Sequence, residues 1–496
     1  MTECKQTSFH FHTGSRRQGV ATFTGGSISS DGGALLLRQV EEHTGLIRQF
    51  AACFTDHRDP ELIEHPLEHL VAQRLYGLAL GYEDLNDHDL LRADPLLAAV
   101  VGDDDPLGAQ RRRRQDRGKA LAGKSTLNRL ELTPVGADET SRYKKIALSC
   151  AHADRLLVDL FLQAYGDRPP RQIVLDCDAT DDPIHGEQLG RFFHGYYDGY
   201  CYLPLYVMCG PFVLAAKLRP SNRDASAGAW EVLQRIVAQI RARWPQVRIL
   251  VRGDSGFCRE PIMAWCEAQP GVDYVLGLAK NARLLRALGA SLHQAQQQCQ
   301  QTRAPARVYQ ELTYRTHQSW SRCRRVVAKA EVLPEGADRT KANPRFVVTS
   351  LAPAAQAAAP LYEETYCARG DMENRIKEQQ MCLFADRTSA ATMRANQVRL
   401  YFSTLAYSLM MLLRRLGLEG TSLAQARCDT IRLKLLKIGA CVKVTARKVW
   451  VALSSACVLQ EVFAQVYRRL VELAPWTDYA ADYAVGPSGR AATAGP

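Results

Sequence analysis

A run of apolar residues interrupted by carboxylates, at residues 171–182, constrains the fold more than any other stretch. It reads Arg-Gln-Ile-Val-Leu-Asp-Cys-Asp-Ala-Thr-Asp-Asp. Its β-branched apolar start predicts a strand inside a covered sheet. Asp176 and Asp178 point to the same face of that strand, because side chains alternate along it. A carboxylate in mid-strand is costly unless something offsets its charge, so the strand predicts a site that supplies positive charge.

Two further stretches bring acidic residues to comparable positions. Residues 247–253 predict a second strand, which ends in Asp254 with a glycine on either side. Residues 366–377 predict a helix, and four of its residues at i, i+3, i+7 and i+11 form one polar stripe. They are Tyr366, Arg369, Glu373 and Lys377.

Two strand-end aspartates and one helical glutamate can converge on a single point. At about 4 Å and an effective dielectric constant near 20, each like-charge pair costs roughly 4 kcal/mol, so the cluster needs cations. Carboxylate oxygens suit Mg²⁺ or Mn²⁺. Such a ligand set is typical of two-metal phosphodiester chemistry.

These residues resemble the DDE transposases of bacterial insertion sequences, which have an RNase H-like catalytic core. Within them, the chain is most similar to the group that includes the families numbered four and thirteen-eighty, and the latter fits best. The resemblance extends from about residue 20 to residue 450, and a segment at 124–131 also takes part. The motifs that carry it are residues 81–95, 175–188, 252–257 and 366–378.

The resemblance implies that Asp178, Asp254 and Glu373 are the catalytic residues and hold two Mg²⁺ ions, with Mn²⁺ as a substitute. Alternation along the strand does not choose between Asp176 and Asp178 as the first ligand. Asp178 is favoured because it is nearer the end of the strand and because Ala-Thr follows it, as in the family. Asp176 is then an acid behind the metal site that orients a ligand or holds a nearby arginine, or else the alternate ligand.

The third motif implies the phosphate contacts. The family pattern is Tyr, Arg, Glu and Lys, separated by two, three and six intervening residues. The lysine position is Gln380 here, and Lys377 lies one helical turn earlier. We expect Tyr366 and Arg369 to bind phosphates, since the planar fork of an arginine matches them, and Lys377 to neutralise charge.

Charge and composition point to a polyanionic partner in a reducing compartment. The chain has 496 residues, a net charge of +11 and a pI near 9.0. Residues 394–450 carry eleven Lys and Arg against two acids, a balance of +9, and Arg432, Lys434 and Lys437 are the expected DNA contacts there. Fifteen cysteines without any Cys-x-x-Cys pair argue against a zinc ribbon or a disulfide framework and for the cytoplasm.

Targeting and membrane signals are not expected from the sequence. The N-terminal residues 1–17 are polar, so no signal peptide is visible. The most apolar helix, near residues 400–413, is too short for a membrane span.

The predicted fold class is α/β: an RNase H-like core with a β-rich insertion, flanked by helical N- and C-terminal regions. The N-terminal region, 1–101, is expected to bind DNA ends. The remaining parts are a basic mobile linker at 102–123, a helical connector at 124–170, core strands at 171–284, the insertion at 285–361, the core helix with the catalytic glutamate at 362–385, a basic helical region at 386–483 and a disordered tail at 484–496.

The sequence therefore predicts a DNA transposase that cuts element ends and transfers the strands into target DNA. Its partners would be double-stranded DNA, both terminal inverted repeats and target, and a second or further copies of the chain in the DNA complex. One alternative is a structure-specific nuclease on the same core, which cuts but does not join. The other is a catalytically silent DNA-binding derivative, against which the intact Asp, Asp, Glu set argues.

Overall fold

The computed structural model describes residues 8–166, 168–336 and 339–476 and divides into two compact units. One unit joins the chain up to Leu148 with the segment that starts at Leu405, and the other runs from Ser149 to Thr404. The predicted tail at 484–496 lies outside the described residues. Within the described part, no helix has both the length and the apolar character that crossing a membrane requires.

The second unit is built on a mixed sheet that contains the expected core. Its first five strands lie in the order β11-β10-β6-β12-β13. β6 is antiparallel to β10 and parallel to β12, and β12 is parallel to β13. This order and these directions confirm the predicted RNase H-like core. The strands are β6 (Gln172–Ala179), β10 (Leu205–Cys209), β11 (Phe212–Lys217), β12 (Arg248–Gly253) and β13 (Val272–Leu278).

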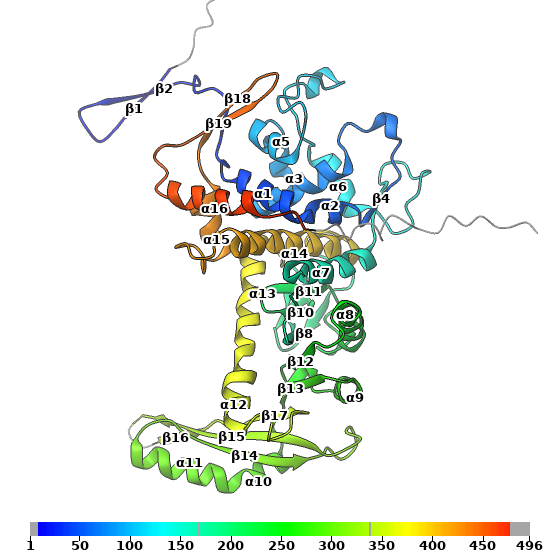
Figure 1. Ribbon diagram of the computed structural model, residues 1–496, viewed down its shortest axis with the longest axis vertical. Helices are drawn as coiled ribbons and strands as arrows, with labels where there is room; N and C mark the ends of the chain where they lie inside the picture. Colours follow the sequence, from blue (N-terminus) through cyan, green and yellow to red (C-terminus); the bar gives the residue numbers. More distant parts are fainter. Residues whose placement is uncertain (1–7, 167, 337–338, 477–496) are drawn as a thin grey trace, which may run out of the picture. The chain divides into compact units, whose positions relative to one another are not determined.

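Helices cover both faces of this sheet (Figure 1). On one side lie α8 (Ala229–Arg243) and α9 (Glu260–Ala268), and on the other lies α13 (Gly370–Leu383), which carries Glu373. The apolar residues of α8 are buried at helical spacing, as its sequence predicts. The acids of β6 therefore have a helix opposite them rather than open solvent.

The insertion continues the core sheet instead of forming a separate one. After α10 (Ala282–Ala287) and α11 (Gly289–Thr302), its strands complete a nine-stranded sheet. β17 pairs with β13, so the insertion covers what would be an exposed edge strand. The insertion strands are β14 (Ala306–Tyr314), β15 (Arg324–Glu335), β16 (Arg339–Ala342) and β17 (Arg345–Thr349).

The first unit is mainly helical. Its centre is α3 (Leu67–Leu80), buried continuously from Leu70 onward, and α2 (Leu46–Ala51) and α5 (Pro95–Val101) pack on it. Near the C-terminus, α16 (Gln460–Glu472) packs on α1 (Ala34–Thr44).

Two predictions about local structure in the first unit are wrong. Residues 102–123 are a folded loop rather than a mobile linker, because Asp103 and Asp116 hold Arg111 and Arg92 at 2.8 and 3.0 Å. The C-terminal region is not helical throughout, since β18 (Ala440–Val444) and β19 (Val449–Leu453) form a hairpin. Both strands are almost wholly apolar and rich in valine, a composition that favours strand over helix.

In the second unit, the mostly apolar run at residues 200–208, within the predicted core region, contributes to two different strands. β9 (Gly199–Tyr202) belongs to a small three-stranded sheet, whereas β10 belongs to the core. Pro204 separates them because it has no N–H to donate to a strand ladder.

Candidate active site

Three acidic residues come to one region of the second unit from three elements. Asp178 is the last residue but one of β6. Asp254 follows β12 directly and caps the short helix η4 (Ser255–Phe257), where its Oδ1 accepts a hydrogen bond of 2.8 Å from the Gly256 N–H. Glu373 lies in the first turn of α13. The order of strands in the sheet puts β6 and β12 side by side, so their acids leave the sheet at the same end.

The guanidinium of Arg369 lies between two of these acids. Its Nη1 is 3.3 Å from Asp178 Oδ2, and its Nη2 is 2.5 Å from Glu373 Oε1. Burial lowers the pKa of Arg369, but the attraction of Asp178 and Glu373 outweighs it and the pKa is raised. The two carboxylates are thus bridged by one cation.

The surroundings of Asp178 shift the pKa of this carboxyl group. Its pKa is raised to about 6, chiefly by burial; the guanidinium of Arg369 opposes the rise, and the negative charges of Asp254 and Glu373 add to it. The three acids therefore act on one another electrostatically, although they are about 75 to 195 residues apart in sequence. Without a further cation, the proximity of these carboxylates lowers the stability of the folded state.

The acids fit a divalent cation in chemistry. They offer hard oxygen ligands, and burial, which raises the pKa of Asp178, makes a cation beside that carboxylate favourable. Among the residues that the structure describes, no three His, Cys, Asp or Glu side chains lie close enough together to hold a metal ion. Arg369 occupies the space between Asp178 and Glu373 instead. Metal binding here therefore requires Arg369 to turn away and the carboxylates to close together.

Asp176 is paired with an arginine. Arg252, from the neighbouring strand β12, donates from Nε to Oδ1 at 2.5 Å and from Nη2 to Oδ2 at 2.8 Å. Burial raises the pKa of Asp176, and the guanidinium opposes that rise. Both carboxylate oxygens are engaged, so Asp176 has the arginine-holding arrangement that was one of its expected roles.

Tyr366 lies close to the backbone that carries Asp254. A Cβ added at Gly277 of β13 would meet the Tyr366 hydroxyl at 2.6 Å, the Ser255 nitrogen at 2.8 Å and the Asp254 carbonyl carbon at 3.1 Å. Burial raises the pKa of Tyr366. The absence of a side chain at Gly277 thus lets the Tyr366 ring and the Asp254 turn approach each other.

The polar stripe of the third motif is not a regular α-helix throughout. Tyr366 ends the π-helical segment η5 (Leu361–Tyr366), Arg369 ends the 3₁₀ segment η6 (Cys367–Arg369), and α13 begins at Gly370. Lys377 is exposed on α13. Local periodicity could not predict these changes of helix type, because they depend on packing against the sheet.

At the position where the family pattern has lysine, Gln380 reaches the loop after β6. Its Nε2 donates to the Asp181 carbonyl and to Asp182 Oδ1, both at 3.1 Å. Burial raises the pKa of Asp182 well above its usual range. The amide at position 380 thus binds both the Asp182 carboxyl group and the backbone that follows Asp178.

Two of the three basic residues expected to contact DNA from the C-terminal region are engaged within the first unit. Arg432 donates to the carbonyls of Ala79 and Leu78, which end α3, at 2.8 and 3.3 Å. Lys437 forms an ion pair of 2.6 Å with the buried Asp31. Lys434 alone among the three is exposed.

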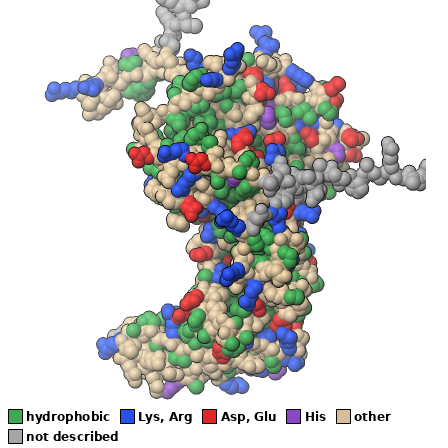
Figure 2. Space-filling model, in the orientation of Figure 1, with side chains coloured by type: hydrophobic (Ala, Val, Ile, Leu, Met, Phe, Trp, Pro, Cys, Tyr) green, Lys and Arg blue, Asp and Glu red, His purple; other side chains and the backbone are tan. Residues whose placement is uncertain are grey.

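Exposed arginines lie instead on the folded loop at 102–123. Arg111 is bound by Asp103 and by the Glu64 carbonyl. The side chains of Arg112, Arg113 and Arg114 are exposed, and none of the ion pairs among the described residues involves them. Figure 2 shows Lys and Arg side chains interspersed with Asp and Glu over the face in view, so net charge alone does not locate a DNA contact.

Sequence reasoning missed two residues of the site, Arg252 and Gly277. Arg252 stands two residues before Asp254 in the Arg-Gly-Asp-Ser-Gly-Phe motif, and an arginine inside a buried strand is itself a sign of a buried acidic partner. Gly277 lies within a strand, where a glycine commonly marks a close backbone approach. Both signals were present, but neither identifies the partner.

The similarity of the chain to known proteins extends over most of its length. Residues 11–475 match the family model described as Transposase DDE domain group 1. No curated protein shows significant similarity to the chain. A solved structure described as the cryo-EM structure of the piggyBac transposase synaptic complex with hairpin DNA is similar at 11% sequence identity and a TM-score of 0.37, over 81% of this chain and 80% of that chain.

Proposed function

The chain belongs to the DDE transposases of domain group 1, and from that premise we propose which residues carry its reaction and which DNA it contacts. It is a DNA transposase, and transposases of this family use divalent metal ions. The proposal is that it cuts at the terminal inverted repeats of an element and joins the ends to target DNA. We also propose that the chain is related to the insertion-sequence family numbered thirteen-eighty. It would act in the cytoplasm, as a dimer or a larger assembly on the DNA.

Asp178, Asp254 and Glu373 are proposed as the residues that hold the metal, two Mg²⁺ ions for which Mn²⁺ substitutes. The observation that carries this proposal is geometric: Arg369 contacts both Asp178 and Glu373, and Asp254 leaves the neighbouring parallel strand at the same end of the sheet as Asp178. The ions would supply Lewis-acid activation of the attacking oxygen and stabilisation of the leaving one.

Arg369 is proposed to exchange its carboxylate partners for a DNA phosphate. Its guanidinium bridges Asp178 and Glu373, and its planar fork suits a phosphate equally well. Tyr366, beside the Asp254 turn, would donate a hydrogen bond to a neighbouring phosphate. Lys377, exposed on α13, would add positive charge along the same DNA.

We propose that the first unit binds the ends of the element by contacting DNA phosphates. Arg112, Arg113 and Arg114 are held on a folded loop with free guanidinium groups, which suits phosphate contacts that add affinity without reading sequence. Lys434 can join them, whereas Arg432 and Lys437 already have partners inside the unit.

The test uses the full-length protein and DNA that contains the sequences flanking its coding region. With Mg²⁺ or Mn²⁺, we expect cuts at inverted repeats and joined products on a target plasmid. Asp254→Ala should abolish cleavage and leave gel shifts of the end DNA intact, because the acid lies outside the proposed phosphate contacts. Cleavage without any joined product would favour a nuclease, and loss of the gel shift in the folded variant would refute the separation of binding from chemistry.

A further inference from the structure

The side chain of Arg252 connects three segments of the second unit at one point. It is 7% exposed and lies in β12, from which it donates two hydrogen bonds to Asp176 of β6. Its remaining terminal nitrogen, Nη1, donates to the Thr365 carbonyl of η5 at 2.5 Å. All three guanidinium nitrogens therefore have a partner.

Each connected segment carries one of the three acids. Asp178 follows Asp176 by two residues, Asp254 follows Arg252 by two, and Glu373 lies eight residues after Thr365. β6 and β12 are already joined by the hydrogen bonds of the sheet. The helix that bears Glu373 has no such ladder, so the bond from Arg252 to the Thr365 carbonyl is a directional link between this helix and the sheet.

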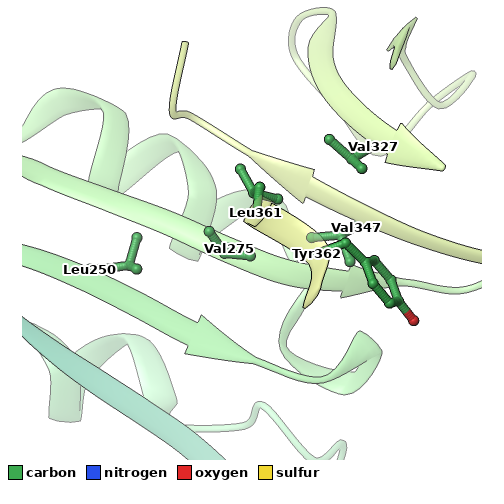
Figure 3. Packing of buried hydrophobic residues seen from close by; sticks show 6 residues of the cluster. All are labelled: Leu250, Val275, Val327, Val347, Leu361 and Tyr362. Atoms are coloured by element: carbon green, nitrogen blue, oxygen red, sulfur yellow. The ribbon is translucent and has the colours of Figure 1, made fainter. Parts of the chain in front are cut away.

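The start of the glutamate helix is also anchored by apolar packing. Leu361 and Tyr362 are buried against residues of β12, β13, β15 and β17, and Figure 3 shows Leu361 beside Val275 and Val347. Hydrophobic contact is not directional, so this cluster fixes where the segment lies better than how it is rotated.

Rotation matters because the backbone between this anchor and Glu373 is irregular. It passes from π-helix to 3₁₀-helix to α-helix within residues 361–370. Thr365 is the last residue but one of the π-helical segment, and its side chain is held by Gln356 at 2.7 Å while its carbonyl is held by Arg252. A planar arginine fork fixes orientation as well as distance.

We propose that Arg252 is a positioning residue, which sets the approach of Glu373 to Asp178 and Asp254 by holding the Thr365 carbonyl. This rests on the proposed function of the three acids. The alternative is a purely structural role, in which Arg252 and Asp176 form a buried ion pair that only stabilises the sheet.

The first test compares Arg252→Lys with Arg324→Lys in the full-length protein. Lysine keeps the charge but lacks the fork, so it cannot serve Asp176 and Thr365 together. Arg324 is a matched control, since it is also buried and binds two carboxylates, Glu260 and Glu267, neither of which is one of the three acids. The readouts are Mn²⁺ affinity by electron paramagnetic resonance, hydrogen exchange of residues 366–376, and the cleavage rate at saturating DNA.

For Arg252→Lys we expect a 10–100-fold lower cleavage rate, weaker Mn²⁺ binding, faster exchange at 366–376 and unchanged DNA affinity, because a small misplacement of a catalytic group costs this much. Arg324→Lys should stay within about twofold of the wild type in rate and Mn²⁺ affinity. Equal losses in the two variants, or wild-type Mn²⁺ affinity in Arg252→Lys, would overturn the proposal.

A double variant, Arg252→Met with Asp176→Leu, separates positioning from stability. Apolar replacement of a buried ion pair often restores stability, but it cannot restore the bond to Thr365. Positioning predicts a stable protein with fast exchange at 366–376 and weak Mn²⁺ binding, whereas recovery of both would overturn it. If the wild type binds Mn²⁺ but cuts no DNA, the proposed function fails, while these two readouts still decide the role of Arg252.

Discussion

Replacing each aspartate of β6 with asparagine should change stability in opposite directions. Asp178 has its pKa raised from 3.8 to about 6, chiefly by burial, so the folded state binds its proton more tightly than the unfolded state does. Stability from this group is complete below pH 3.8 and is lost as the pH rises through 6. Above pH 6, the ionised Asp178 lowers the free energy of unfolding by about two pKa units times 1.36 kcal/mol, or roughly 3 kcal/mol.

Asp178→Asn removes this penalty because an amide has no proton to lose. Arg369 keeps its contact with Glu373, so the substitution leaves no orphaned cation. At pH 8 without metal, the variant should be more stable than the wild type by up to about 3 kcal/mol, and at pH 4 the difference should vanish.

Asp176→Asn should destabilise the protein instead. Arg252 is 9% exposed in its side chain and would lose its charged partner, and the amide nitrogen would face the Nη2 donor. Leaving a buried charge unpaired costs about 3–5 kcal/mol.

Urea unfolding of the full chain in EDTA at pH 8 and pH 4, with hydrogen exchange across β6, measures both effects. Asp181→Asn is a matched control, since Asp181 lies just after the same strand. A loss of stability in Asp178→Asn at pH 8 would show that this carboxylate is not held against an electrostatic cost. Added Mg²⁺ should stabilise the wild type by mass action and leave Asp178→Asn nearly unchanged.

Four further outcomes are expected. Because Asp178 must lose its proton to bind metal, Mn²⁺ affinity should fall about tenfold for each pH unit below 6, and a flat titration would contradict this. Neutralising the three arginines at 112–114 should reduce the salt slope of log K for DNA by about 0.9 per lost phosphate contact, and an unchanged slope would mean that they contact no phosphate. Lys437→Ala should leave that slope unchanged but lower the stability by roughly 3 kcal/mol, because its buried carboxylate partner loses its cation. Gly277→Ala should reduce cleavage more than tenfold by displacing the Asp254 turn, whereas Gly289→Ala, with nothing within 4 Å, should not.

Local patterns were enough to locate the core strands. The alternation and the β-branched content of β6 and β12 are properties of neighbouring residues, and they place Asp178 and Asp254 at strand ends without any tertiary information. Where a local signal competed with composition, reading the sequence failed. The hairpin of β18 and β19 has a valine-rich strand composition inside a region whose net charge is strongly positive, and the loop at 102–123 has the charge of a linker but is folded by its ion pairs.

The sequence by itself predicts Asp178, Asp254 and Glu373 as residues of the site, but the tertiary structure decides which side chains contact them. Arg369 bridges Asp178 across 191 positions, and Arg252 binds Asp176 across 76, so no window of sequence contains either pair. Net charge counts every lysine and arginine equally, whereas folding satisfies some of them with buried partners, as Asp31 does for Lys437. Packing between distant segments therefore decides which lysine and arginine side chains are left to contact DNA. It also decides which side chain holds the helix of Glu373, because the partners of a residue far away in sequence are set by the folded chain and not by local periodicity.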